Sequence, residues 1–207
     1  MGREFELKYR ATAQQLEAMK HVYGGGKTIA METTYYDTPD GAFSKRRWTL
    51  RRRLENGVSV CTLKTTLPDG SRGEWEIESD DLLSAIPRLI ALGAPGEIAA
   101  LTAGGIVPTC GARFTRHAIA LPSGGGTVEL ALDEGVLLGG GKEEPLREAE
   151  VELKSGEDDD AIRFAQSLAQ CFSLTPEPKS KLARAKALAV QPLRHGSLCE
   201  GAGREAD

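Results

Sequence analysis

Alternation of charged and apolar residues with a period of two constrains this chain of 207 residues more than any other feature. The pattern begins near the N-terminus, where Glu4, Glu6 and Lys8 alternate with aromatic and leucine side chains. In a β-strand this spacing places the charges on one face and the apolar side chains on the other. Residues 3–10 are therefore predicted to form a half-buried strand.

The alternation returns in five later segments, and in most of them the charges have one sign. Arg51 and Arg53 share one strand face, whereas a later strand carries Glu74 and Glu76. Like charges repeated on one face repel each other, so exposure to water does not explain them. Two arrangements stay open. The charged faces of a sandwich would meet water, whereas a sheet closed on itself would enclose the charges and leave its apolar outside to helices.

Turn and cap signals divide the chain into about eight strands and several helices. Thr12 and Ser180 are expected to cap helices, and Asn56-Gly57 is a strong hairpin signal. One α+β domain is therefore expected at residues 1–190, followed by a disordered tail at 191–207. The predicted strands are residues 3–10, 27–36, 47–55, 58–65, 71–79, 113–121, 127–133 and 147–154, and the predicted helices are residues 13–23, 80–92, 95–103, 158–171 and 180–190.

Composition limits the partners that the chain is expected to have. The net charge is -4, which argues against nucleic-acid binding through a basic surface. No apolar run approaches the length of a membrane span and no signal peptide is evident, so no membrane partner is expected and the predicted location is cytoplasmic. A monomer and a homodimer both stay open. The cysteines expected to be free thiols are Cys61, Cys110, Cys171 and Cys199.

A lumen that contains this many charges needs a charged ligand. Unpaired charges in a site of low dielectric constant change their pKa values or bind partners. Clustered Arg and Lys side chains favour an anion with several oxygens, above all a polyphosphate. Clustered Glu side chains favour a hard divalent cation such as Mg2+ or Mn2+. The two clusters together indicate a metal-bound triphosphate.

The ordered motifs of the chain resemble those of a known family. Residues 4–8 look like the ExExK signature of the CYTH domain, the triphosphate tunnel metalloenzymes, and the resemblance extends over residues 3–190. It implies a closed eight-stranded antiparallel β-barrel, a tunnel with a charged lumen and with helices packed outside. The later motifs are Tyr35-Tyr36-Asp37-Thr38-Pro39, Leu50-Arg51-Arg52-Arg53, Lys64, Arg72-x-Glu74-x-Glu76, Glu129-Leu130-Ala131-Leu132-Asp133, Glu148-x-Glu150-x-Glu152 and Ser180-Lys181-x-x-Arg184.

The resemblance also implies roles for individual residues. In one place the chain departs from the family: Arg113 and Arg116 are three residues apart, whereas family members often have two basic residues two apart, so only Arg116 is carried over. Phosphate oxygens would be held by Lys8, Arg51, Arg53, Lys64, Arg116, Lys181 and Arg184. Metal ions would be bound among Glu4, Glu6, Asp133, Glu148, Glu150 and Glu152. Turnover is expected to depend most directly on Glu4, Glu6, Lys8, Arg53, Glu74 and Glu76.

The implied activity is hydrolysis of inorganic triphosphate to diphosphate and phosphate with one or two Mg2+ or Mn2+ ions. The most similar members are bacterial inorganic triphosphatases, in which a helical CHAD domain often follows; this chain is expected to lack that domain. Three alternatives stay open: a class IV adenylate cyclase that converts ATP to cyclic AMP and diphosphate, a thiamine triphosphatase, and a non-catalytic module that binds polyphosphate or nucleotides. The many carboxylates argue against the last, because holding a polyanion requires only the basic residues.

Overall fold

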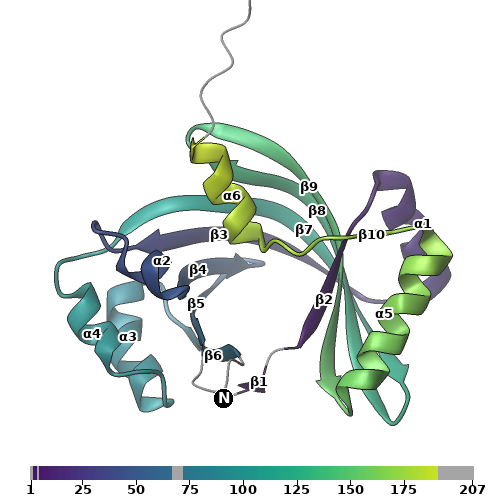
Figure 1. Ribbon diagram of the computed structural model, residues 1–207, viewed down its shortest axis with the longest axis horizontal. Coiled ribbons are helices and arrows are strands. Elements are labelled where there is room, and N and C mark those ends of the chain that lie inside the picture. Colours follow the sequence, from purple (N-terminus) through teal and green to yellow (C-terminus); the bar gives the residue numbers. More distant parts are fainter. Residues whose placement is uncertain (1, 4, 67–71, 191–207) are drawn as a thin grey trace, which may run out of the picture.

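The chain forms one antiparallel β-sheet with helices on both of its faces (Figure 1). The structure is a computed structural model that describes residues 2–3, 5–66 and 72–190. The strands are β1 (Gly2–Arg3), β2 (Glu6–Arg10), β3 (Lys27–Asp37), β4 (Thr49–Glu55), β5 (Val58–Thr66), β6 (Arg72–Glu78), β7 (Val107–Ser123), β8 (Gly126–Gly139), β9 (Lys142–Ser155) and β10 (Thr175–Pro176). The helices are α1 (Ala13–Tyr23), α2 (Ala42–Arg46), α3 (Leu82–Ala91), α4 (Glu97–Thr102), α5 (Asp158–Phe172) and α6 (Lys181–Val190).

The closed eight-stranded barrel expected from the resemblance is wrong. Ten strands pair in the order β1-β6-β5-β4-β3-β7-β8-β9-β2-β10, and among the described residues no pairing joins the β10 edge to the β1 edge. The sheet is therefore open, but it curves strongly and its concave face surrounds a charged space (Figure 1). Alternation determines which face a side chain occupies, but it carries no information about whether the two end strands meet.

The N-terminal segment differs from the single strand predicted at residues 3–10. Its first part, β1, pairs with β6 and places Gly2 opposite Glu74. Its second part, β2, pairs with β9 and places Lys8 opposite Glu150. The segment thus contributes a strand to each side of the sheet, and each edge ends in a strand of two residues.

The strands β7, β8 and β9 are the longest in the sheet, with 17, 14 and 14 residues. The sequence predicted shorter strands there, because charged and apolar residues alternate over only part of each strand. Gly140 and Gly141 turn the chain from β8 to β9 with φ values of 57° and 73°, which favour glycine over residues with a Cβ atom. The extra length lets β7, β8 and β9 reach beneath α6.

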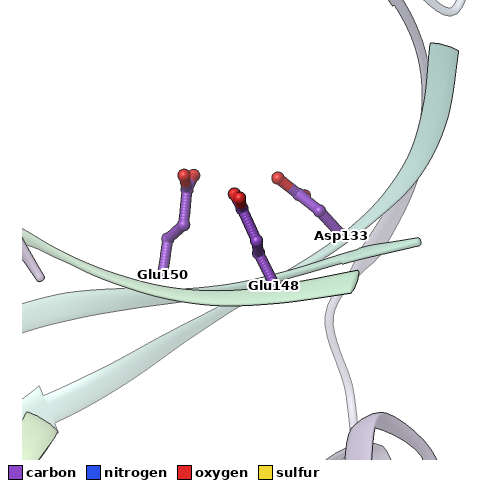
Figure 2. A group of neighbouring side chains, drawn as sticks. All are labelled: Asp133, Glu148 and Glu150. Atoms are coloured by element: carbon purple, nitrogen blue, oxygen red, sulfur yellow. The ribbon is translucent and has the colours of Figure 1, made fainter. Parts of the chain in front are cut away.

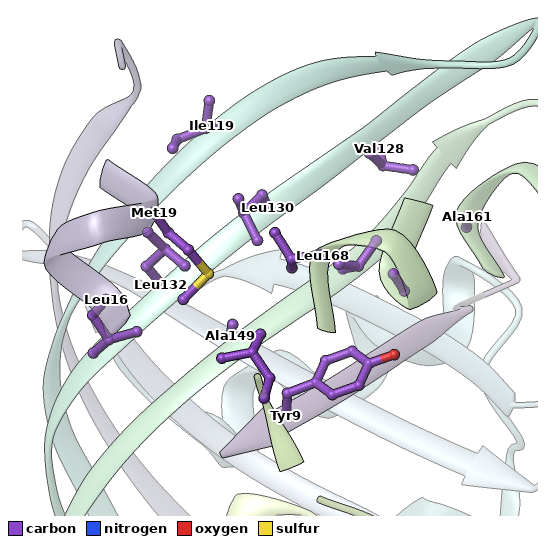
Figure 3. Close-up of a cluster of buried hydrophobic side chains, with 13 residues drawn as sticks. Tyr9, Leu16, Met19, Ile119, Val128, Leu130, Leu132, Ala149, Ala161 and Leu168 are labelled. Atoms are coloured by element: carbon purple, nitrogen blue, oxygen red, sulfur yellow. The ribbon is translucent and has the colours of Figure 1, made fainter. Parts of the chain in front are cut away.

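The helices α1 and α5 cover the convex face of β2, β8 and β9 (Figure 3). Thr12 caps α1 as predicted: its hydroxyl accepts the Gln15 N–H at 3.2 Å, and the Gln15 side chain accepts the Thr12 N–H at 2.7 Å. Leu16 and Met19 of α1 are fully buried in this cluster together with Leu130 of β8. Burying one such side chain contributes roughly 1.5–3 kcal/mol, so this cluster is a main source of stability.

The helices α3 and α4 cover the convex face of β4, β5 and β6. Asp81 caps α3 by accepting the Ser84 N–H at 2.7 Å. Leu89 of α3 is fully buried with Leu63 of β5, and Trp75 of β6 packs in the same cluster. The apolar residues of β4 and β6 are buried beneath these two helices on the convex face. The charged residues that alternate with them therefore point to the concave face, which is the predicted inward direction.

The helix α6 lies on the concave side of the sheet, which corrects the expectation that all helices pack outside (Figure 1). Its residue Ala185 is buried against Ala112, Leu137 and Leu146, which share the strand face of the cavity-lining charges. The concave face is therefore apolar where α6 covers it. Gly139 permits the close approach, because a Cβ atom there would collide with the Ala185 carbonyl oxygen.

Three further predictions concern the whole chain. Cys61, Cys110 and Cys171 are free thiols, as predicted. Cys199 belongs to the predicted tail, residues 191–207, and this segment lies outside the described residues. None of the helices in the described part of the chain combines the length and the apolar character that a membrane crossing requires.

Candidate active site

The concave face contains a cavity of about 290 Å3, lined by side chains from eight strands and from α6. It brings together most of the residues predicted for the site. Asp133, Glu148 and Arg184 do not line it and are buried next to it, whereas Glu4 lies outside the described residues. The predicted residues that line the cavity are Glu6, Lys8, Arg51, Arg53, Lys64, Glu74, Glu76, Arg116, Glu150, Glu152 and Lys181.

The strands β4, β5 and β6 arrange their cavity residues in rows across the sheet. Lys64 of β5 lies opposite Glu74 of β6, and in the next row Thr62 lies between Arg51 and Glu76. Neighbouring rows are about 6.6 Å apart, since each strand residue advances by about 3.3 Å. We call this group the basic wall, after its three cations. It consists of Arg51, Arg53 and Lys64 together with the two carboxylates that pair with them, Glu74 and Glu76.

Ion pairs hold the cations of the basic wall in place. The Arg51 Nη2 atom lies 3.4 Å from Glu74 Oε1 and 3.2 Å from Glu76 Oε1, and Lys64 Nζ lies 3.1 Å from Glu74 Oε1. Burial by itself would raise the pKa of Glu76, but Arg51, Arg53 and a 2.8 Å hydrogen bond from Thr62 outweigh it and lower the pKa. Glu76 is therefore a carboxylate at neutral pH and orients the guanidinium groups.

Three carboxylates gather on the other side of the cavity. Asp133 of β8 lies opposite Glu148 of β9, and Glu150 follows two residues later on the same strand face. One oxygen of each residue lies within 4.8 Å of the others, and all three side chains are buried. Figure 2 shows that the three point to the same side of the sheet. We call them the acidic trio.

The acidic trio already binds basic side chains. Lys181 Nζ, from α6, lies 2.9 Å from Asp133, 2.7 Å from Glu148 and 2.7 Å from Glu150. Arg116 Nη2 lies 2.8 Å from Asp133 and 2.6 Å from Glu150. Burial opposes ionisation of both Lys181 and Glu150, but their attraction outweighs it, so the pKa of Lys181 is raised and that of Glu150 is lowered. Lys181 and Glu150 are therefore charged at neutral pH, whereas burial raises the pKa of Glu148 above its usual value.

The chemistry of the donors determines which metal ion the site could bind. Carboxylate oxygens are hard ligands, which suit Mg2+ and Mn2+, and the acidic trio brings three of them close together. The trio also binds the ammonium group of Lys181, so a divalent ion would compete with Lys181 for it. Glu6 and Glu152 lie opposite each other across β2 and β9, and both face the cavity. The residues present thus fit a hard divalent cation.

The cavity also contains residues that the sequence analysis did not assign to it. Glu129 of β8 lies opposite Glu152, and Lys154 Nζ lies 2.8 Å from Glu152 and 3.7 Å from Glu129. Glu129 lies on the same strand face as Asp133, and Lys154 lies on the same strand face as Glu152. Because Asp133 and Glu152 were predicted site residues, the alternation could have identified Glu129 and Lys154 as well. The remaining unassigned charged residues of the cavity are Glu55 and Arg72.

The strand β7 confirms the predicted difference between its two arginines. Arg113 points away from the cavity and its Nη2 atom lies 3.4 Å from Glu143, whereas Arg116 lines the cavity. Phe114 shares the face of Arg116, and its ring centre lies 5.8 Å from the Arg116 guanidinium carbon and 5.4 Å from Lys181 Nζ. Both distances suit cation–π contacts, so Phe114 supports the two cations that bind the acidic trio.

Comparison with known proteins agrees with this geometry. An inorganic triphosphatase from Haemophilus influenzae is 28% identical over 144 residues, which cover 69% of this chain and 41% of that protein. The chain thus spans less than half the length of this relative. A Hippeastrum protein described as a candidate adenylyl cyclase with a dominant triphosphatase activity has a TM-score of 0.66 at 20% identity, over 93% of this chain and 100% of that one.

A second solved structure, a candidate adenylate cyclase from Bacillus halodurans, has a TM-score of 0.63 at 18% identity, over 87% of this chain and 96% of that one. At this identity the two structures establish a shared fold and no more. The family comparison reaches further, because the CYTH domain model matches residues 2–185. On this match, and with the ordered charged motifs lining one cavity, the chain belongs to the CYTH domain family.

Proposed function

We propose that this chain hydrolyses inorganic triphosphate to diphosphate and phosphate, in a reaction that depends on Mg2+ or Mn2+. The observation that carries this proposal is the basic wall, because three cations in successive rows face the same cavity as a group of carboxylates. Clustered Arg and Lys groups bind an anion with many oxygens better than any other ligand class. The similarity to an inorganic triphosphatase supports the choice of substrate.

In this proposal the substrate lies along the basic wall, between the wall and the side of the cavity formed by β2 and β9. Arg51 and Arg53 each offer several N–H donors in a fixed plane, whereas Lys8 and Lys64 contribute compact charges. Glu74 and Glu76 fix the direction of Arg51 through the ion pairs described above. Preorganised cations of this kind stabilise the charge that develops when a phosphate anhydride bond breaks.

The carboxylates that face the cavity are the proposed metal ligands. Glu6, Glu150 and Glu152 would hold the ion, together with Glu4, which lies outside the described residues. Asp133 and Glu148 are further candidate ligands, which become available if the Lys181 ammonium group moves away from them. When bound, a divalent cation neutralises phosphate charge and promotes ionisation of a water molecule.

A product analysis tests the proposal. The purified chain is incubated with inorganic triphosphate, ATP or thiamine triphosphate, each with Mg2+, Mn2+ or EDTA, and the phosphate-containing products are identified. We expect equal amounts of diphosphate and phosphate from inorganic triphosphate, and no products in EDTA. Formation of cyclic AMP from ATP as the main reaction would favour a cyclase instead, and absence of any product would favour a binding module.

A further inference from the structure

A second cavity, of about 620 Å3, adjoins the first one at the end of the basic wall. The two cavities share Ile29 and Glu55 as lining residues, so they are neighbours. We call the second one the outer mouth. In addition to the two shared residues, its lining consists of Lys27, Thr28, Asn56, Val58, Val60 and Glu78. The Thr28 hydroxyl lies 3.4 Å from His117 Nδ1, and the Asn56 side chain accepts the Ala30 N–H at 2.8 Å.

The strand register places the outer mouth beside the last cation of the basic wall and in the row beyond it. Val60 lies opposite Arg53, and Glu78 lies opposite Val60 on the other side. In the next row Glu55 lies opposite Val58. The first three rows therefore present Lys64, Arg51 and Arg53, and beyond Arg53 the same wall becomes apolar and acidic.

The outer mouth is a poor environment for a phosphate group. Val58 and Val60 offer no hydrogen bonds, and a phosphate placed against them would lose water without gaining a partner. The carboxylates of Glu55 and Glu78 would repel it. Lys27 is the single cation among the lining residues, and it is solvent-exposed at the start of β3. Two carboxylates and one ammonium group line the outer mouth, so its net charge is negative.

We infer that the anion-binding site ends at Arg53, and that Val60 and Glu78 limit the length of the bound polyphosphate by excluding a further phosphate from the outer mouth. This inference rests on the proposed function, since it concerns the substrate of the same cavity. It adds a specificity boundary: a triphosphate is bound along the three rows of cations, and a longer chain is disfavoured when it extends beyond Arg53.

The introduction of a positive charge at the boundary tests the inference. Val60→Lys and Glu78→Lys each place a cation in the outer mouth, in the same row as Arg53, and kcat/KM is measured for inorganic triphosphate and inorganic tetraphosphate at fixed Mg2+ and ionic strength. We expect the ratio of tetraphosphate to triphosphate to rise by about tenfold in each variant, since one hydrogen bond to a charged group contributes on that scale. Val22→Lys, at a position on α1 that is 64% exposed, is the matched control and leaves the ratio unchanged.

A binding measurement separates the inference from the proposed function. Calorimetry in EDTA gives the affinities of both anions without hydrolysis. If the wild-type chain hydrolyses neither anion but the binding ratio changes in the two variants, the proposed function fails and the boundary stands. If the tetraphosphate-to-triphosphate ratios of kcat/KM and of binding affinity both stay within twofold of the wild-type values in both variants, the inference is overturned. Should Val60→Lys fail to fold by circular dichroism, Glu78→Lys at its exposed position decides the outcome alone.

Discussion

Lys181 lies within 2.9 Å of three buried carboxylates next to the cavity. Its ammonium group contacts all three carboxylates of the acidic trio, and its side chain is only 10% exposed. A buried charge that loses its partner is strongly destabilising, and Lys181 is a partner shared by all three buried carboxylates. Lys181 therefore acts as an internal cation that neutralises the trio as long as α6 packs on the sheet.

Replacement of Lys181 by methionine should make the protein depend on divalent cations for stability. Met keeps much of the side-chain volume but removes the ammonium group, and breaking a buried ion pair costs about 3–5 kcal/mol. We expect Lys181→Met to unfold at a lower temperature in EDTA and to recover part of the loss in Mg2+. Thermal melts with and without Mg2+ measure this. An equal response to Mg2+ in wild type and variant would contradict it.

Arg52 and Arg53 offer a direct comparison of neighbouring residues on opposite faces. Arg53 lines the cavity and pairs with Glu55, whereas Arg52 Nη1 donates to the Asp80 carbonyl oxygen at 3.0 Å on the convex side. We expect Arg53→Gln to lower kcat/KM for inorganic triphosphate about a hundredfold, which is the scale of one lost transition-state contact. Arg52→Gln should change it by less than about threefold. Similar losses in both variants would contradict the assignment of Arg53.

At the scale of single elements, the segment predicted as a turn at residues 37–41 has a larger role. The carboxylate of Asp37 accepts the N–H groups of Phe43 and Ser44 at 2.9 and 3.2 Å, and the Thr38 hydroxyl accepts that of Ala42 at 2.7 Å. These contacts satisfy the first amides of α2. Asp37 also lies 3.5 Å from Lys186 of α6, so one buried carboxylate connects α2 to the helix that covers the cavity.

Substitution of Asp37 by asparagine should therefore destabilise the protein in a pH-dependent way. Burial alone raises the pKa of Asp37, but hydrogen bonds from Ser44, Phe43 and Thr38 outweigh it and hold the pKa below its usual value. The unfolded state then binds more protons than the folded state near its pKa of about 3.9, so the contribution of Asp37 is complete above about pH 5 and declines as the pH falls.

Urea unfolding of Asp37→Asn measures this effect. We expect a loss of about 2 kcal/mol at pH 7, the scale of hydrogen bonds to a charged group, and a smaller difference from wild type near pH 3.5. The matched control is Asp159→Asn, an exposed position in the first turn of α5, where the loss should be at most about 1 kcal/mol. A difference that grows as the pH falls would contradict the expected sign.

Strand faces could be predicted from the sequence, whereas contacts between distant elements could not. The alternation correctly predicted that Arg51 and Arg53 share one strand face, because parity is a local property of a strand. The inward direction of that face was predicted only by the family resemblance. No local pattern indicates that Lys181 of α6 reaches the acidic trio. Without the family resemblance, Lys181 is only one of many basic residues on a helix, and its position depends on where α6 packs.

At the scale of the whole molecule, the position of α6 and the open sheet are the two features that the sequence did not predict. Ala112, Leu137 and Leu146 have the parity of cavity residues, so an apolar patch interrupts the charged face and receives α6. The edges of the sheet depend on β1 and β10, which have two residues each and are too short to leave a periodic signal. The long strands were therefore predicted in the right places, although β7, β8 and β9 were predicted too short, and the short strands that define the edges were missed.

The charge balance of the whole cavity yields the last prediction. Its lining contains eight basic and seven acidic side chains, so it is close to neutral without a ligand. A triphosphate alone would bring a large excess of negative charge next to Glu6, Glu150 and Glu152, whereas a divalent cation bound with it offsets that excess. Metal and triphosphate should therefore bind more tightly together than either does alone.

Ligand-dependent stabilisation measures this coupling, with triphosphate supplied in large excess over what the chain hydrolyses during the measurement. The metal–triphosphate complex, taken as one ligand at about 100 times its Kd, should stabilise the folded chain by about 2.7 kcal/mol, which raises Tm by roughly 5–10 °C for a chain of this size. Mn2+ alone or triphosphate alone in EDTA should give smaller shifts, and Arg53→Gln should lose most of the joint shift. If triphosphate in EDTA raised Tm as much as the pair, the carboxylates facing the cavity would not be metal ligands. The joint shift should also fall with added salt, because dissolved ions screen the attraction between the ligands and those cavity charges that face solvent.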